Sequence, residues 1–178
     1  MRVDKPSKTP VIIGIFIFLW LPTFRSTSYT GGRKDGIDFG NIFNCEDFCE
    51  DEFNDYLFKC NSLCIVKPHP MANHLSYVNK SNIIYISEKW LLDSKLTLYE
   101  VLGSADCLIS DISSVIVDFM LLNRPIILLF QDFEEYSQTR GFSFSPIKDY
   151  LPAKITQSFK EFMSFIGNGF KLKKDDES

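Results

Sequence analysis

The chain has 178 residues, of which 45% are hydrophobic, so it is long enough for one domain with its own core and short for two. Its formal net charge of -4 and isoelectric point near 5.2 argue against a nucleic-acid-binding protein, because such domains usually carry a clear basic excess. A phosphate-bearing ligand needs only a few local cations and backbone amides, so the acidic total does not exclude one.

The first apolar run, VIIGIFIFLWLP at residues 11–22, follows two lysines and has two interpretations. One is a signal peptide, but no small-residue cleavage site follows the run. The run is also too short to cross a bilayer, which needs about 20 apolar residues. Its β-branched and aromatic content favours a buried central strand at about 11–19. Residues 1–10 are then expected to form a flexible N-terminus.

An acidic segment with several cysteines, CEDFCEDEFNDYLFKCN, begins at Cys45. Its apolar residues recur at helical spacing, which predicts a helix with a solvated acidic face rather than a cation site. Cys45 and Cys49 are expected one turn apart on this helix, whereas zinc ligands usually lie closer together in turns. We therefore predict no metal site, and reduced, mostly buried cysteines in a cytosolic protein.

Further along the chain, short apolar strands alternate with amphipathic helices. The strands are expected at 63–67, 83–87, 107–110 and 125–130, and the helices at 95–105, 114–123 and 155–167. Such alternation is typical of a parallel sheet covered by helices on both faces. We predict one doubly wound, Rossmann-like α/β domain over residues 11–168, followed by a charged tail at 169–178.

The motif SDISS lies at the end of an expected strand and has two interpretations. Ser and Asp are common N-cap residues, but one cap does not explain Ser110, Asp111, Ser113 and Ser114 together. The alternative is a phosphate bound at the N-terminus of the next helix, with hydroxyl groups as additional donors. Asp118, one turn past Ser114, would repel a pyrophosphate, so we expect it to accept hydrogen bonds from a sugar or glycerol hydroxyl.

Three further polar clusters follow expected strands, and the carboxyl ends of parallel strands meet at one edge of a sheet. In KPHP, Lys67 and His69 could donate to phosphate oxygens, although a His between two prolines is also typical of a rigid structural turn. LPTFR brings the hydroxyl of Thr23 and the guanidinium of Arg25, a group suited to phosphate. Arg140 follows the strand after SDISS.

Taken in order, PTFR, KPHP, LYEVLGSADCLISDISSVIVDFMLLNRPIILLF and YSQTRGF resemble the carboxyl-terminal half of the CDP-glycerol glycerophosphotransferase family. These proteins are teichoic-acid and capsule polymerases that use CDP-activated polyols. The resemblance covers roughly residues 11–166, and SDISSVIVDF followed by RPIILL is its most specific part. The family in turn resembles GT-B glycosyltransferases, which have two Rossmann-like halves and hold the donor mainly in the second.

The resemblance implies a binding site for CDP-glycerol or a related CDP-polyol. His69 would stabilise charge on the phosphates and would not act as the base, and Thr23 and Phe24 would lie near the diphosphate. With the two arginines added from the strand ends, the expected substrate-binding residues are Thr23, Phe24, Arg25, Lys67, Pro68, His69, Ser113, Ser114, Asp118 and Arg140.

The implied reaction transfers polyol phosphate, without a cofactor, to a lipid-linked acceptor that grows into a teichoic-acid or capsule-like polymer. Family members carry a preceding half with a catalytic His in an HG-type motif, which neither His69 nor His74 fits. We therefore expect an incomplete enzyme whose base belongs to a separate N-terminal half, located in the cytoplasm or peripherally at the inner face of the cell membrane. The alternative is a non-catalytic nucleotide-binding module or a subunit of a split transferase.

Overall fold

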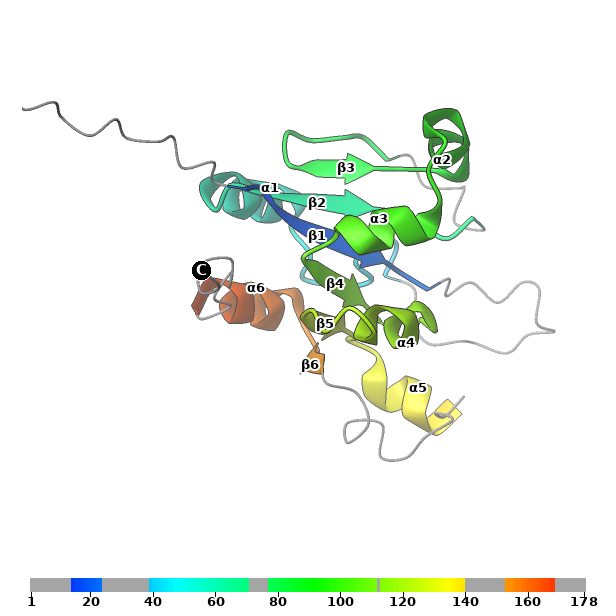
Figure 1. Cartoon of the computed structure of the whole chain (residues 1–178). Coiled ribbons are helices and arrows are strands. Elements are labelled where there is room, and N and C mark those ends of the chain that lie inside the picture. Colours follow the sequence, from blue (N-terminus) through cyan, green and yellow to red (C-terminus); the bar gives the residue numbers. More distant parts are fainter. Residues whose placement is uncertain (1–13, 24–38, 71–76, 112, 140–152, 169–178) are drawn as a thin grey trace, which may run out of the picture.

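The structure is a computed structural model that describes residues 14–23, 39–70, 77–111, 113–139 and 153–168. In these ranges six parallel strands form one sheet with the order β3-β2-β1-β4-β5-β6 (Figure 1). The strands are β1 (Phe16–Leu21), β2 (Ser62–Val66), β3 (Ile83–Tyr85), β4 (Cys107–Ser110), β5 (Ile126–Leu129) and β6 (Ala153–Thr156). The chain proceeds outward from β1 in both directions, so the predicted doubly wound fold is confirmed.

Helices cover both faces of this sheet. One face carries α2 (Glu88–Ser94), α3 (Leu98–Ser104) and α4 (Val115–Met120), the other carries α1 (Glu50–Lys59) and α6 (Phe159–Asn168), and α5 (Phe133–Thr139) follows β5 (Figure 1). Successive residues of a strand point to opposite faces, so Phe18 and Trp20 pack toward α1 and α6 while Leu19 and Leu21 pack toward α2–α4. Burial on both faces explains why the strands are continuous apolar runs.

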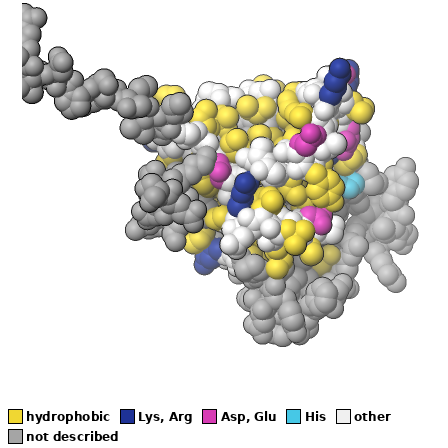
Figure 2. Space-filling model, in the orientation of Figure 1, with side chains coloured by type: hydrophobic (Ala, Val, Ile, Leu, Met, Phe, Trp, Pro, Cys, Tyr) yellow, Lys and Arg dark blue, Asp and Glu magenta, His cyan; other side chains and the backbone are white. Residues whose placement is uncertain are grey.

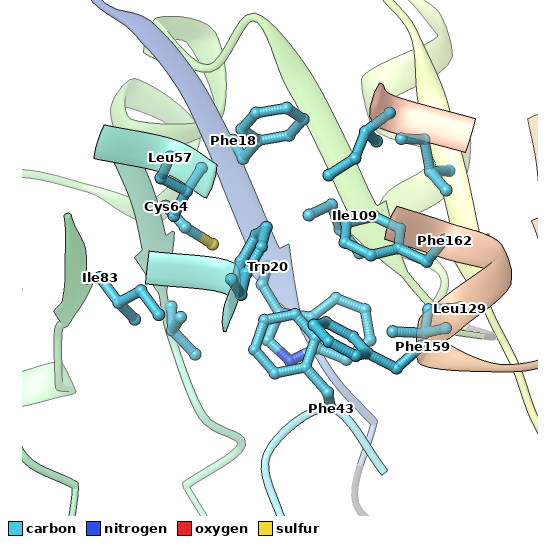
Figure 3. Packing of buried hydrophobic residues seen from close by; sticks show 14 of the residues in the cluster. Phe18, Trp20, Phe43, Leu57, Cys64, Ile83, Ile109, Leu129, Phe159 and Phe162 are labelled. Carbon is cyan, nitrogen blue, oxygen red and sulfur yellow. The ribbon is translucent and has the colours of Figure 1, made fainter. Parts of the chain in front are cut away.

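The core on the side of α1 and α6 is rich in aromatic rings (Figure 3). The Trp20 ring stacks on Phe43 with centroids 5.1 Å apart and planes 3° apart, and Trp20 Nε1 donates to the Ile42 carbonyl oxygen at 2.8 Å. Phe53 of α1 makes an edge contact with Phe162 of α6 at 5.6 Å. Because the indole N–H has a partner, Trp20 can be buried and can fix the segment before α1 against the central strand.

Two expected boundaries at the start of the chain are wrong. The first strand is β1 and not 11–19, and residues 11–13 lie outside the described part. The first helix begins at Glu50, so Cys45 precedes it instead of lying on it one turn from Cys49. Cys45 is buried against the core, whereas Cys49 is the exposed N-cap. The expected termini, 1–10 and 169–178, also lie outside the described residues.

Three later helices are shorter than expected, one of them α3, which was expected at 95–105. The helix at 155–167 begins at Phe159, because Ile155 and Thr156 instead pair with β5 as part of β6. The helix at 114–123 ends at Met120 and is followed by a turn in which Asn123 has a φ of 50°. The sequence analysis did not predict α2, α5 or β6. The helices α2 and α5 are short, with seven residues each. Only Leu91 of α2 is buried, so α2 shows no apolar stripe.

All five cysteines are free thiols, and three of them are buried. Burial raises the pKa of Cys45 to about 12 and also raises the pKa of Cys64 and Cys107, so these thiols stay protonated and unreactive. The described residues contain no group of three or more His, Cys, Asp or Glu that could hold a metal ion. They also include no helix that is both long and apolar enough to span a bilayer.

Candidate functional site

The polar motifs meet at the carboxyl edge of the sheet, to the right in Figure 1. Central β1 pairs with β2 on one side and with β4 on the other, so the loops that follow these three strands adjoin. These loops contain Thr23, Lys67 and Asp111. The boundary between β1 and β4 is where the strand order reverses, and open α/β sheets bind ligands in the crevice at that point.

Asp111 ties the loop after β1 to the loop after β4. Its carboxylate accepts the Thr23 backbone N–H at 3.1 Å through each oxygen, and Oδ2 accepts the Thr23 hydroxyl at 2.5 Å. Asp111 is only 3% exposed. The Thr23 hydroxyl therefore donates its hydrogen bond to Asp111, so toward a ligand the hydroxyl oxygen can only accept a hydrogen bond. Asp111 therefore fastens the loop after β4 to the loop after β1, and the motif SDISS alone did not distinguish this role from helix capping.

Lys67, directly after β2, is paired with Glu88, which is not among the expected site residues. Its Nζ lies 2.5 Å from Glu88 Oε1, and the two side chains are 7% and 58% exposed. A nearly buried ammonium needs a counter-charge, and Glu88 supplies it from the start of α2. Glu88 directly follows the strand expected at 83–87, so the sequence indicated its position at the same edge but not its pairing with Lys67.

His69 and Pro68 line a cavity of about 520 Å³ beyond the ends of β2 and β3. Tyr77, Tyr85 and Trp90 line the same cavity, and the two tyrosine rings stack with centroids 4.9 Å apart. The Tyr85 hydroxyl donates to Glu50 Oε1 at 2.7 Å, and burial together with this bond raises the pKa of Tyr85. A cavity of this size with aromatic walls is typical of a small-molecule site. The sequence analysis did not predict this cavity.

Helix capping does not account for the serine pair. Ser114 is the N-cap of α4, yet its own backbone is helical and its side chain makes no capping hydrogen bond. The Ser113 hydroxyl accepts the Val115 N–H only at 3.5 Å, a long contact. Ser114 is exposed, so its hydroxyl is available to a ligand. The capping interpretation is therefore wrong for Ser114 and weak for Ser113.

Asp118 lies one turn along α4 and is half-buried. Its Oδ2 accepts the Tyr99 hydroxyl from α3 at 3.1 Å. No hydrogen bond or ion pair within the described ranges joins Lys67 to the serine pair, so these groups share an edge without forming one bonded cluster. The expected residues Phe24, Arg25 and Arg140 lie outside the described part.

Comparison with known proteins identifies relatives for nearly the whole chain. Residues 4–178 match the family described as CDP-Glycerol:Poly(glycerophosphate) glycerophosphotransferase. The chain is 28% identical over 172 residues to the teichoic acid ribitol-phosphate polymerase TarK of Staphylococcus aureus, covering 94% of this chain and 30% of that protein. It is 32% identical over 126 residues to a teichoic acid glycerol-phosphate primase of Bacillus spizizenii, covering 70% of this chain and 28% of the primase.

Solved structures of the wall teichoic acid polymerase TagF have the same fold. One matches with a TM-score of 0.60 at 22% identity, covering 86% of this chain and 34% of TagF. A TagF variant soaked with CDPG matches with a TM-score of 0.61. The chain thus spans about a third of the length of these relatives. The match over residues 4–178 shows that the chain belongs to the CDP-glycerol:poly(glycerophosphate) glycerophosphotransferase family.

Proposed function

We infer that this chain binds a CDP-activated polyol, such as CDP-glycerol, along the carboxyl edge of its sheet. The observation that carries this inference is that the family-like motifs converge at the edge of the sheet where β1, β2 and β4 end. The donor then serves transfer of polyol phosphate to a lipid-linked teichoic-acid or capsule-like acceptor. The chain would work in the cytoplasm or peripherally at the inner face of the cell membrane.

The cavity beyond β2 and β3 suits the nucleoside part of such a donor. Pro68, Tyr85 and Trp90 offer apolar and aromatic surface, against which a pyrimidine ring can pack. The carboxyl ends of β3 and β4 are three strand spacings apart, or about 14 Å. An extended donor would therefore begin in the cavity, cross the ends of β2 and β1, and reach α4.

Lys67 and His69 would hold the diphosphate. Phosphate oxygens would replace the Glu88 carboxylate at the Lys67 ammonium, because Glu88 is exposed enough to be hydrated when it leaves. The serine hydroxyls would add neutral donors from the other side of the crevice. Asp118 would accept a hydroxyl of the polyol, which lies at the end of the donor that reaches α4, since a carboxylate next to the diphosphate would repel it.

In the proposed reaction the acceptor hydroxyl attacks the β-phosphorus of the donor. The new bond joins the acceptor oxygen to phosphorus, and the bond to the bridging oxygen breaks, so CMP leaves with the electron pair. Positioning and stabilisation of charge are what this step needs, and Lys67, His69 and the serine hydroxyls would supply them. The acceptor proton would go to a base outside this chain, in a separate N-terminal half.

A second candidate is a nucleotide-binding module without transferase activity. The observation that favours it is the absence of a His-Gly pair from the sequence, since Pro70 follows His69 and Leu75 follows His74. In this case the donor would bind in the same way, but no bond would break.

Isothermal titration of the chain with CDP-glycerol, CDP-ribitol and CMP tests the proposed site. We expect saturable binding of all three, with a CDP-polyol binding more tightly than CMP because Asp118 adds a contact. Failure of all three to bind would contradict the proposal. Incubation with CDP-glycerol and a lipid-linked primer separates the two candidates. We expect no CMP release by the chain alone, and release well above a no-protein control would show that it carries its own base.

A further inference from the structure

Tyr99 is an exposed aromatic residue whose hydroxyl is nevertheless fixed. Its side chain is 65% exposed on the face formed by α2, α3 and α4, where other hydrophobic side chains also reach the surface (Figure 2). The hydroxyl donates to Asp118 Oδ2 at 3.1 Å, which joins the first turn of α3 to α4. An exposed phenol can bond with water, so burial does not force this contact.

The first turn of α3 holds Tyr99 in place. Thr97 and Glu100 form a capping box, in which Glu100 Oε2 accepts the Thr97 N–H at 2.7 Å and the Thr97 hydroxyl accepts the Glu100 N–H at 3.2 Å. Tyr99 lies between these two residues, in the same turn. The capping box thus fixes the backbone of the turn that carries Tyr99, independently of any ligand.

The bond leaves Asp118 with one oxygen committed and one available. Oδ2 receives the Tyr99 hydroxyl, while Oδ1 has no hydrogen-bond partner among the described residues. The bond to Asp118 raises the pKa of Tyr99, so the phenol keeps its proton and remains a donor through neutral and mildly alkaline pH. A carboxylate with one oxygen fixed cannot rotate freely, and its second oxygen then has a defined direction.

We propose that Tyr99 is a positioning residue for the donor, because its hydroxyl orients Asp118 so that Oδ1 accepts a hydroxyl of the bound polyol. This inference rests on the proposed function. Tyr99 belongs to the family-like segment that begins LYEVLG, but it is not among the expected substrate-binding residues. Tyr99 itself touches no ligand in this arrangement and acts only through Asp118. The alternative is a purely structural bond between α3 and α4.

The test compares Tyr99→Phe, Asp118→Asn and the double variant by titration with CDP-glycerol and CMP. Tyr99→Phe keeps the ring and removes the hydroxyl, so we expect CDP-glycerol affinity to fall about threefold to tenfold. For each ligand that Asp118→Asn binds more weakly, Tyr99→Phe should lower the affinity less than Asp118→Asn does. The double variant should bind no more weakly than Asp118→Asn alone, because both changes disable the same contact.

Tyr56→Phe is the matched control. The Tyr56 hydroxyl donates to the Ile166 carbonyl oxygen at 2.7 Å on the opposite face of the sheet, so its loss should change the melting temperature and leave ligand affinity unchanged. If Tyr99→Phe lowers the melting temperature but binds CDP-glycerol like the unmodified chain, the bond is only structural and the inference is wrong. If Asp118→Asn also binds normally, the proposed function of Asp118 itself fails.

Discussion

Two carboxylates at the carboxyl edge, Asp111 and Glu88, have opposite surroundings. Asp111 is 3% exposed and receives both the N–H and the hydroxyl of Thr23. Glu88 is 58% exposed and pairs with the nearly buried ammonium of Lys67. A buried carboxylate that loses its donors remains desolvated, whereas an exposed one can be hydrated when its partner leaves. We therefore expect the Asp111 carboxylate to be structural, and the Glu88 carboxylate to be displaced from Lys67 by phosphate.

The largest expected effect tests the structural half of this comparison. Asp111→Ala removes the acceptor of the Thr23 donors at a nearly buried position, so we expect the free energy of unfolding to fall by about 2–4 kcal/mol. Urea unfolding followed by circular dichroism measures this change. Asp93→Ala is the control, because Asp93 forms an exposed pair with Lys89 and its loss should cost less than about 0.5 kcal/mol. Equal losses in both variants would contradict the structural role of Asp111.

If phosphate displaces Glu88 from Lys67, removal of the Lys67 ammonium should weaken binding of the donor. Lys67→Met keeps the apolar stem and removes the ammonium, so affinity for CDP-glycerol should fall by about 1.5–3 kcal/mol, as for a lost bond to a charged group. Isothermal titration measures the loss. Lys154→Met is the matched control, because Lys154 of β6 pairs with Glu161 of α6 at the far edge of the sheet from β2, and this variant should bind normally.

Glu88→Gln tests whether the Glu88 carboxylate competes with the donor for Lys67. It removes the competing charge but keeps an oxygen that can accept from Lys67. Affinity for CDP-glycerol should therefore stay the same or rise by up to about 1 kcal/mol. Weaker binding by Glu88→Gln would mean that Glu88 contacts the ligand and is not displaced by it.

The smallest expected effect concerns the serine pair. Ser114 makes no capping hydrogen bond, so Ser114→Ala should change the free energy of unfolding by less than about 0.5 kcal/mol. Thermal and urea unfolding are sufficient to measure it. A loss near 1 kcal/mol, typical of an N-cap, would restore the capping interpretation and weaken the case for a ligand at this serine.

The sequence predicted the sheet and the placement of its motifs, because continuous apolar strands show both features directly. PTFR, KPHP and SDISS each follow a strand, and parallel strands bring their carboxyl ends to one edge. The termini of elements were less accurate, as for β6, where the short AKIT strand directly precedes the helical pattern of α6. Apolar periodicity did not separate the two.

The partners of the site residues could not be predicted from the sequence. Glu88 lies 21 residues from Lys67 and begins a helix without an apolar stripe. Tyr99 lies 19 residues from Asp118, and their bond depends on how α3 packs beside α4. The cavity likewise needs side chains from β3, α2 and the KPHP loop. Such contacts are set by tertiary packing, which no local pattern encodes.

A crystal structure of the chain with CDP-glycerol would show directly whether the donor binds along the carboxyl edge of the sheet. We expect the base to lie in the cavity between Pro68 and Trp90 and the diphosphate to lie within hydrogen-bond distance of Lys67. The Lys67 ammonium should then have left Glu88, while the bond between Thr23 and Asp111 should persist. Ligand density elsewhere on the molecule, or a diphosphate bound with the Lys67–Glu88 pair intact, would contradict the account.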